Sequence, residues 1–321
     1  MTTSTALLTD RYELTMLAAA LRDGTASRPS VFELFSRRLS GGRRFGVVAG
    51  TGRLLTLLRE FRFGDDELRF LRDNDVVDAE SLTYLENYRF TGSIRGYREG
   101  ELYFPGSPIL TVEGSFADAV VLETLALSVL NHDSAVATAA SRMSIAAGER
   151  PLAEMGSRRA AEQSAVAAAR AAYIAGFRAT SNLEAGRRWG IPTMGTAAHS
   201  WTLLHETEEE AFRSQIDSLG TDTTLLVDTY DIRTGVETAI RVAGTGLGGV
   251  RIDSGDLPIV AAEVRAQLDE LGATGTRITV TSDLDEYAIA ALAASPVDAY
   301  GVGTSVAVSY THLTLPTILL V

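Results

Sequence analysis

The sequence contains neither cysteine nor lysine. Its 321 residues include 29 basic ones, and every one of these is arginine. Without cysteine the chain can form no disulfide, thiolate zinc site or iron–sulfur cluster, and it offers no cysteine nucleophile. Without lysine it cannot form a Schiff base, hold pyridoxal phosphate covalently or use the lysine of a Walker-type phosphate loop. Any chemistry must therefore rely on arginine, carboxylates, histidine, hydroxyls and backbone groups.

Positive charge and long apolar runs are scarce as well. The formal net charge is −12, so we expect no nucleic-acid partner, because binding a phosphate backbone needs a dense basic surface. The longest apolar stretch, residues 119–130, contains Glu123 and is too short to cross a bilayer. Asp10, Arg11 and Glu13 interrupt the first apolar residues, which argues against a signal peptide. We therefore predict a cytoplasmic protein with no membrane partner.

The hydrophobic patterns divide the chain into three segments. Residues 1–115 mix helical spacing with short strands and predict a smaller N-terminal α+β domain. Residues 116–305 open with an Ala- and Leu-rich helical stretch and then alternate short apolar runs with helices, which is typical of a parallel sheet. We predict an α/β barrel for this segment, with a doubly wound open sheet as the alternative that periodicity alone does not exclude. Residues 306–321 follow neither pattern.

Polar residues stand at the end of each of six expected strands in the second segment. The strands are residues 152–155, 191–194, 224–227, 249–252, 278–280 and 297–300. The carboxyl ends of the strands of an α/β barrel meet at one rim, where substrates bind. We therefore expect the following residues at this rim: Arg158, Arg159, Thr196, His199, Ser200, Asp228, Asp231, Arg251, Asp253, Ser254, Asp283, Gly301, Gly303 and Thr304.

The residue types at this rim suit a phosphorylated sugar. Arginine binds phosphate or carboxylate through two parallel hydrogen bonds. Aspartate holds Mg²⁺ through oxygen or accepts hydrogen bonds from sugar hydroxyls. Glycine-rich turns and helix N-termini present backbone N–H groups to phosphate. A rim with all three predicts a sugar carrying several phosphates with bound magnesium.

Each of these residues also has a structural interpretation. Ser200 and Asp283 could simply cap the helices that follow them, and Arg158 and Arg159 could form a solvated turn. His199 is the strongest candidate for a functional role, because the small residues before it leave its ring open at the rim. The coincidence of six polar strand ends is harder to explain structurally than any single one.

Five stretches of the sequence together resemble nicotinate phosphoribosyltransferases. They are residues 8–16, 156–159, 195–200, 251–256 and 301–304, and the similarity runs from about residue 7 to residue 305. The resemblance implies an irregular α/β barrel of the type II phosphoribosyltransferase kind, in a homodimer with shared active sites. It further implies ATP-coupled transfer of phosphoribose from phosphoribosyl pyrophosphate to nicotinate, with Mg²⁺, giving nicotinate mononucleotide and pyrophosphate in NAD salvage.

The resemblance also assigns roles to individual residues. His199 matches the histidine that ATP phosphorylates, and Tyr12 matches an aromatic residue that stacks on nicotinate from the partner subunit. Arg251 and Asp253 match residues at the pocket for the base and phosphoribosyl pyrophosphate. The carboxylates implied to face ribose and magnesium are Asp228, Asp231 and Asp283, and the candidate metal ligands are Asp228, Asp231 and Asp253. The remaining implied substrate contacts are Arg158, Arg159, Thr196, Ser200, Ser254, Gly301, Gly303 and Thr304.

Two departures from the family pattern leave alternatives open. Ala161 stands where relatives carry a polar His or Gln, and the pattern stops near residue 305. The second departure predicts a truncated reading frame with an incomplete barrel, and hence poor solubility or inactivity. The alternatives are a nicotinamide or quinolinate phosphoribosyltransferase, a non-catalytic remnant, or an unrelated barrel lyase that uses aspartate and Mg²⁺.

Overall fold

A computed structural model describes residues 4–39, 42–308, 312–314 and 317–318, with side chains as far as residue 308. The chain forms two compact units, one of Met1–Thr138 with Tyr310–Val321 and the other of Ala139–Ser309. The division falls inside helix α6 (Glu123–Ala147), which passes from the first unit into the second. The boundary expected between residues 115 and 116 comes earlier in the chain, and the domain limits stay a prediction.

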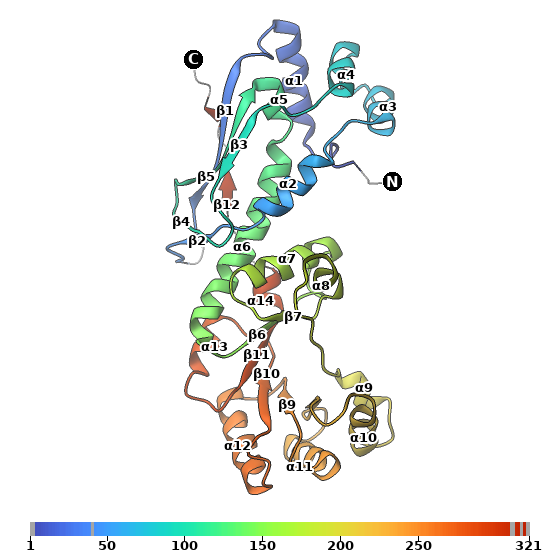
Figure 1. The fold of residues 1–321 in the computed structure, drawn as a ribbon, viewed down its shortest axis with the longest axis vertical. Coiled ribbons are helices and arrows are strands. Elements are labelled where there is room, and N and C mark those ends of the chain that lie inside the picture. The colour runs from blue at the N-terminus through green and yellow to red at the C-terminus, as the bar shows by residue number, and fades with distance from the viewer. Residues whose placement is uncertain (1–3, 40–41, 309–311, 315–316, 319–321) are drawn as a thin grey trace. The chain divides into compact units, whose positions relative to one another are not determined.

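The first unit is built on an antiparallel sheet (Figure 1). Its strands β1 (Pro29–Arg38), β3 (Ser93–Gly96), β5 (Pro108–Ser115) and β12 (His312–Thr314) lie in the order β12-β1-β5-β3, and β13 (Thr317–Ile318) also pairs with β1. A separate pair joins β2 (Gly46–Val47) to β4 (Leu102–Tyr103). Alternate side chains of β1 are buried, as expected for a sheet with one face on the core. Residues 309–311, 315–316 and 319–321 of the unusual tail lie outside the described residues.

Helices cover this sheet and complete the core of the first unit. They are α1 (Arg11–Asp23), α2 (Thr51–Arg59), α3 (Asp65–Asp73), α4 (Ala79–Glu86), α5 (Phe116–Val120) and the first part of α6. The fully buried side chains include Leu17, Phe32, Leu34, Leu54, Leu71, Leu85, Ile109 and Leu110. Each such side chain stabilises the fold by about 1.5–3 kcal/mol relative to its exposed state.

The second unit contains a parallel sheet whose strand order identifies a barrel. Its strands are β6 (Leu152–Glu154), β7 (Ala179–Thr180), β8 (Thr224–Leu226), β9 (Gly249–Ile252), β10 (Arg277–Val280) and β11 (Ala299–Val302), in the order β7-β6-β11-β10-β9-β8. The first and last strands of the unit, β6 and β11, are neighbours, so the strands follow one another in a single direction around the sheet, as in a barrel. A doubly wound sheet instead reverses direction from its middle. The predicted barrel is confirmed, and it is incomplete because no hydrogen-bonded pair joins β7 to β8 among the described residues.

One of the six expected strands was wrong. The second strand of the barrel is β7, whereas residues 191–194 contribute only an isolated bridge between Thr180 and Thr193. In this segment the Pro192 carbonyl accepts from Thr180 N at 3.0 Å, and Met194 N donates to the Thr180 carbonyl at 3.0 Å. Proline has no N–H to donate, so this segment cannot continue as a regular ladder.

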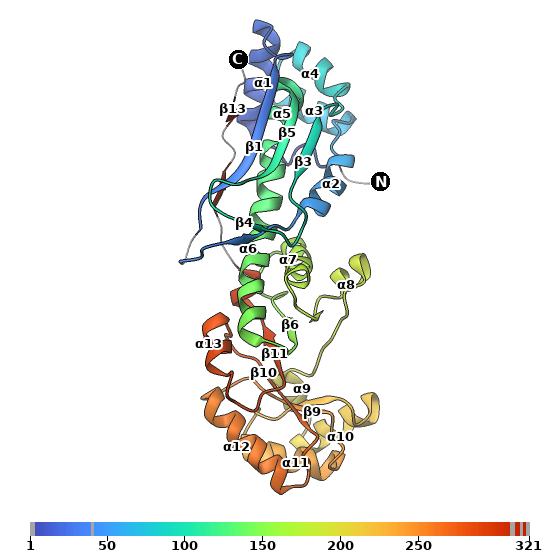
Figure 2. The same cartoon turned by 60° about the vertical axis from the view of Figure 1, so that its left-hand side comes forward.

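The helices of the second unit lie outside the strands. They are α7 (Glu162–Ile174), α8 (Leu183–Trp189), α9 (His199–Leu203), α10 (Glu208–Leu219), α11 (Ile232–Ala243), α12 (Leu257–Glu270), α13 (Glu286–Ala291) and α14 (Thr304–Ala307). Figures 1 and 2 show α10, α11 and α12 next to one another, close to β9. Among the helices that the structure describes, none combines the length and apolar character needed to cross a membrane. The carboxyl ends of the parallel strands carry the polar residues considered next.

Candidate functional site

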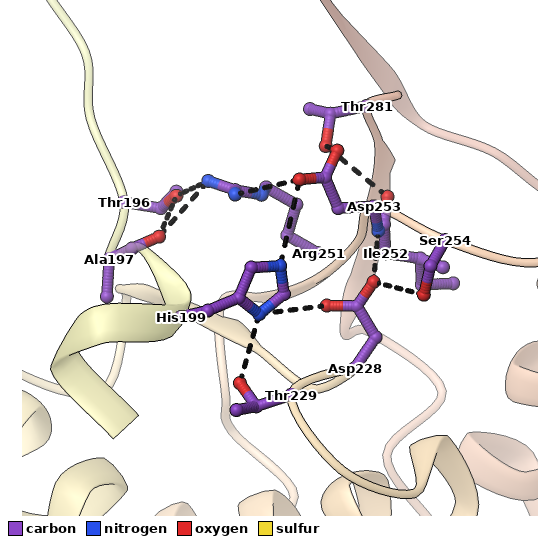
Figure 3. A network of polar contacts seen from close by, with 10 residues as sticks. All are labelled: Thr196, Ala197, His199, Asp228, Thr229, Arg251, Ile252, Asp253, Ser254 and Thr281. Carbon is purple, nitrogen blue, oxygen red and sulfur yellow. Dashed lines mark hydrogen bonds and ion pairs between the residues drawn. The ribbon is translucent and has the colours of Figure 1, made fainter. Parts of the chain in front are cut away.

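The rim of the second unit carries a connected polar network (Figure 3). Asp228 follows strand β8, Asp253 follows β9, and Thr281 follows β10. Residues 196–199 approach the same place from the loop that leads into α9. Segments far apart in the sequence thus meet at the strand ends, as the alternation of strands and helices predicted.

Asp228 is the buried anchor of this network. Its side chain is fully buried, and its Oδ2 accepts hydrogen bonds from the Asp253 backbone N and the Ser254 hydroxyl, both at 2.7 Å. The other oxygen, Oδ1, is buried and accepts no hydrogen bond from any described residue. A buried carboxylate oxygen without a partner is costly, so this atom is available to a cation or a ligand donor. Asp228 therefore holds the turn after β9 through Oδ2, while Oδ1 stays available to a ligand.

His199 lies between two carboxylates at the start of α9. Its Nδ1 is 3.2 Å from the Thr229 hydroxyl oxygen and 3.9 Å from Asp228 Oδ1. Its Nε2 is 3.9 Å from Asp253 Oδ2 (Figure 3). The side chain is 42% exposed, which leaves the ring within reach of a ligand. The position that the sequence singled out is thus an oriented and accessible imidazole.

Arg251 ties the loop before α9 to strand β9. Its Nη1 donates to the Thr196 hydroxyl and, at 3.2 Å, to the Ala197 carbonyl, while Nη2 lies 3.7 Å from Asp253 Oδ2. Burial lowers the pKa of Arg251, and the charges of Asp253 and Asp228 oppose that shift. The guanidinium Nε is buried without a hydrogen-bond partner among the described residues. An unsatisfied donor beside the rim is suited to an anion.

A pocket of about 270 Å³ opens beside this network. Its walls are Met155, Arg158, Arg159, Arg251, Asp253, Thr281, Ser282, Asp283, Gly301, Gly303 and Thr304. Eight of the predicted rim residues therefore line one cavity: Arg158, Arg159, Arg251, Asp253, Asp283, Gly301, Gly303 and Thr304. A larger groove of about 620 Å³ lies between α11 and α12, but the residues that carry the rim network do not line it.

Comparison with known proteins decides the family. Residues 7–131 match the family model of the nicotinate phosphoribosyltransferase N-terminal domain. A nicotinate phosphoribosyltransferase of Mycobacterium tuberculosis is 62% identical over 307 residues, which cover 93% of this chain and 68% of the relative. The Bacillus subtilis enzyme is 38% identical over 316 residues, covering 96% of this chain and 64% of that protein. The chain belongs to the nicotinate phosphoribosyltransferase family.

The fold agrees with this membership. The crystal structure of human nicotinic acid phosphoribosyltransferase superimposes with a TM-score of 0.84 and 28% sequence identity, covering 97% of this chain and 74% of that one. Both units of the chain therefore have the fold of the phosphoribosyltransferase family. The chain spans about two thirds of the length of the curated relatives.

Two non-glycine residues in the pocket wall have strained backbones. Ser282 and Asp283 have φ angles of 86° and 26°, in the left-handed region that side chains other than glycine rarely adopt. Such conformations cost about 1–3 kcal/mol each and persist where the surroundings impose them, which is common at functional sites. The sequence placed Asp283 at the rim but carried no sign of this geometry.

Gly301, which lines the pocket, is also required for packing within the barrel sheet. It lies in the buried strand β11, where a Cβ atom would come within 2.6 Å of Thr281 Cγ2 and 2.7 Å of Met155 Sδ. Any side chain here would displace Thr281, whose hydroxyl donates to Asp253 Oδ1 at 2.6 Å. Thr281 and Thr229 are contacts that were not predicted from the sequence, although Thr281 directly follows an expected strand and Thr229 comes two residues after another.

Two of the predicted rim residues, Ser200 and Asp231, belong neither to the polar network nor to the pocket wall. Ser200 is exposed in the first turn of α9, and its side chain makes no hydrogen bond to another described residue. Asp231 caps helix α11, where Oδ1 accepts from Thr234 N at 2.9 Å and from its hydroxyl at 2.7 Å. These two bonds lower the pKa of Asp231. Its role as a metal ligand stays a prediction that this geometry does not favour.

Tyr12 belongs to the first unit, unlike the rim residues. Its hydroxyl donates to Glu123 Oε1 at 2.9 Å, and its side chain is 46% exposed. Burial, followed by the carboxylate of Glu123, raises the pKa of Tyr12 to about 12. The phenol therefore stays neutral at physiological pH and presents a partly exposed, tethered ring.

Glu13 is buried beside Tyr12 rather than capping α1. Asp10 and Glu13 have the three-residue spacing of a capping box, but the Asp10 side chain makes no cap bond. Glu13 accepts instead from the Thr9 hydroxyl and, at 2.8 Å, from Thr124 N. Burial raises the pKa of Glu13 to about 7, with Glu123 and Asp10 adding to the shift.

The Glu13→Gln variant is expected to flatten the pH dependence of stability. The carboxyl group binds its proton more tightly in the folded state, so the free energy of unfolding falls as pH rises from about 4.5 to about 7. Glutamine does not titrate, and the variant should lose roughly 2 kcal/mol of this dependence after solvent screening. Denaturant unfolding between pH 5 and pH 8 measures it. Equal slopes for the two proteins would contradict the assignment.

Proposed function

We propose that this protein transfers phosphoribose from phosphoribosyl pyrophosphate to nicotinate, as its family membership indicates. The observation that carries the proposal is the pocket at the strand ends. Arg158, Arg159 and Arg251 line it together with Asp253 and Asp283. Arginines suit the phosphate groups of the donor, and carboxylates suit a ribose that gains positive charge. The proposed substrates, nicotinate and phosphoribosyl pyrophosphate, and the proposed product are those of the family.

The reaction is a displacement at the anomeric carbon. The ring nitrogen of nicotinate forms a bond to that carbon while the bond to the pyrophosphate oxygen breaks, and its electron pair leaves with pyrophosphate. Little proton transfer is needed, so catalysis depends on orientation and electrostatics. Asp253, positioned by Thr281 and by the turn that Asp228 holds, is suited to stabilise the developing positive charge on the sugar.

Magnesium fits this rim as a companion of the substrate. The described residues contain no group of three or more histidine, aspartate or glutamate side chains that could hold a metal ion alone. Mg²⁺ commonly uses one or two carboxylates together with substrate phosphates. The unpartnered Asp228 Oδ1 and the Asp253 Oδ2 atom supply such oxygens. When bound with the donor, the ion would neutralise charge on the leaving pyrophosphate.

We further propose that ATP phosphorylates His199. The ring nitrogen would take the γ-phosphoryl group, ADP would leave, and water would later hydrolyse the phosphohistidine. A phosphoryl group adds about −1.5 to −2 charge. The two neighbouring carboxylates, Asp228 and Asp253, lie within 4 Å of the ring and would repel it. ATP use would thereby reorganise the pocket during turnover.

We propose a homodimer with shared active sites, in which Tyr12 stacks on the nicotinate bound by the neighbouring subunit. Tyr12→Ala is then expected to raise the KM for nicotinate about two- to tenfold, the value of one aromatic contact, with little change in kcat. Tyr12→Phe is the matched control, because it keeps the ring and loses only the bond to Glu123. Steady-state kinetics and size-exclusion chromatography test both points. A fully active monomer would contradict the shared site.

The choice of acceptor distinguishes this function from the alternatives. The chain is incubated with phosphoribosyl pyrophosphate, Mg²⁺ and ATP, and with nicotinate, nicotinamide or quinolinate in parallel. We expect nicotinate to react faster than nicotinamide, because arginines favour an acid over an amide, and faster than quinolinate, because the chain belongs to the nicotinate phosphoribosyltransferase family. Faster reaction of nicotinamide or quinolinate would favour the related transferases. Absence of product with all three, while the M. tuberculosis relative is active, would indicate a non-catalytic chain.

A further inference from the structure

We propose that Glu154 is a positioning residue for the binding of phosphoribosyl pyrophosphate. It would act through the turn of residues 156–159, called the arginine turn below because it carries Arg158 and Arg159. This inference rests on the proposed function, since that function supplies the ligand. Glu154 itself does not line the pocket. It lies beneath the pocket wall, as the last residue of β6.

Both carboxylate oxygens of Glu154 are used inside the protein. The residue is completely buried. Its Oε1 accepts a short hydrogen bond from the Gly156 backbone N, and its Oε2 accepts from the Thr180 hydroxyl at 2.7 Å. Burial raises the pKa of Glu154, while these two bonds oppose the shift. A carboxylate is retained in a buried place only where its partners compensate the loss of water.

The arginine turn lies directly on this carboxylate. A Cβ atom on Gly156 would come within 2.8 Å of Glu154 Oε1 and 2.3 Å of Ala307 Cβ, so only glycine permits the approach. The turn then closes through a hydrogen bond from Arg159 N to the Gly156 carbonyl at 2.8 Å. The two arginines that follow are exposed and line the pocket. The direction in which they leave the strand is set where Glu154 holds Gly156.

A second set of hydrogen bonds connects the arginine turn to the same carboxylate. Asn182 Nδ2 donates to the Ser157 hydroxyl at 3.0 Å, and Asn182 N donates to the Thr180 hydroxyl oxygen at 3.0 Å. Thr180 donates in turn to Glu154. The bonds therefore form a closed ring that joins the ends of β6 and β7 to the arginine turn. Such a ring fixes geometry more strongly than one bond does.

Loss of the carboxylate should act on the donor substrate more than on the acceptor. Without Glu154 the Gly156 N–H and the Thr180 hydroxyl are buried and unsatisfied, and the turn is released from the strand. Two-point binding of phosphate by arginine depends on orientation. We expect Glu154→Ala to raise the KM for phosphoribosyl pyrophosphate about tenfold, a factor typical of a lost hydrogen bond to a charged group. The KM for nicotinate and kcat should change by much less.

Two further variants separate positioning from general stability. Glu154→Gln should restore most of the affinity, because its amide oxygen can accept from Gly156 while its NH₂ group donates to Thr180. Thr276→Val is the matched control, since it removes a buried hydrogen bond at 2.9 Å to the Leu247 carbonyl. Thr276 directly precedes β10 and so lies at the amino end of that strand, away from the rim. This control variant should lower the melting temperature and leave the KM for phosphoribosyl pyrophosphate unchanged.

Ser157→Ala gives an independent measurement if Glu154→Ala does not fold. It removes the hydroxyl that accepts from Asn182 Nδ2 and leaves the cap bond from Ala185 N to Asn182 in place, so we expect a smaller rise in the same KM. Calorimetric titration with Mg²⁺-phosphoribosyl pyrophosphate measures binding without turnover. Wild type that binds the donor but forms no nicotinate mononucleotide would contradict the proposed function alone. Unchanged donor affinity in folded Glu154→Ala, or in Ser157→Ala, would overturn the role of Glu154.

Discussion

His199→Ala is expected to abolish ATP hydrolysis and ATP stimulation while leaving slow, ATP-independent formation of nicotinate mononucleotide. The imidazole is the proposed acceptor of the phosphoryl group, and alanine offers no nitrogen. The pocket at the strand ends stays in place, because Arg251 and Asp253 keep their contacts to Thr196 and Thr281. The ATP-stimulated rate should fall by about 100-fold or more, the lower end for a positioned catalytic group.

His205→Ala is the matched control for this variant. His205 lies six residues further on, where Nδ1 contacts the Trp201 carbonyl at 2.9 Å and its ring lies against the Trp201 ring. This histidine has a structural partner and no contact with the rim carboxylates among the described residues, so ATP coupling should persist. Coupled ATPase and product assays on both variants test the assignment. An ATP-stimulated rate in His199→Ala equal to that of wild type would disprove it.

Arg251→Lys is expected to weaken substrate binding by tens of fold although the charge is kept. The guanidinium reaches the loop before α9 through Nη1 and Asp253 through Nη2, and its Nε is left for a ligand. An ammonium group cannot make these contacts at once, since it lacks the planar fork. The loss of one two-point charged interaction is worth about 1.5–3 kcal/mol, or about 10- to 150-fold in affinity.

Arg277→Lys is the control for the chemistry of this exchange. Arg277 opens strand β10, where it is exposed and contacts the Gly248 carbonyl at 3.2 Å and Asp222 at 3.4 Å. Exposed pairs of this kind contribute little, so kinetics should stay near wild type. KM values for both substrates and thermal melts are compared for the two variants. Unchanged kinetics of a stable Arg251→Lys protein would make Arg251 a structural residue only.

Much of the barrel was predictable because its strands are buried on both faces. Buried parallel strands appear in the sequence as short apolar runs, and the residue after each run is placed at the rim by the fold. Asp228 and Asp253 were found in this way. Strand β7 was missed because Ala179 and Thr180 carry no apolar run, whereas residues 191–194 do. The pairing of β6 with β11, which identifies the barrel, joins residues far apart in the sequence, so local periodicity does not predict it.

At single residues the sequence alone is ambiguous, because one spacing fits two environments. Glu13 stands three residues after Asp10, as in an exposed capping box, yet its side chain turns inward to Thr124. Asp231 stands three residues after Asp228, close enough to share a site, yet it caps α11. Asp228, in contrast, meets the turn of Asp253 from the neighbouring strand. Only the placement of other elements distinguishes these outcomes, and a single sequence does not supply it.

The most direct test of the account is the product balance of the chain and of its Asp253→Asn variant. Purified protein is supplied with nicotinate, phosphoribosyl pyrophosphate, Mg²⁺ and ATP, and nicotinate mononucleotide and pyrophosphate are quantified by chromatography. We expect equal amounts of both products from wild type. For Asp253→Asn we expect a large fall in turnover with little change in melting temperature, because the carboxylate lines the pocket while the fold keeps its other contacts. Wild-type turnover that Asp253→Asn retains in full would contradict the placement of the active site at this rim.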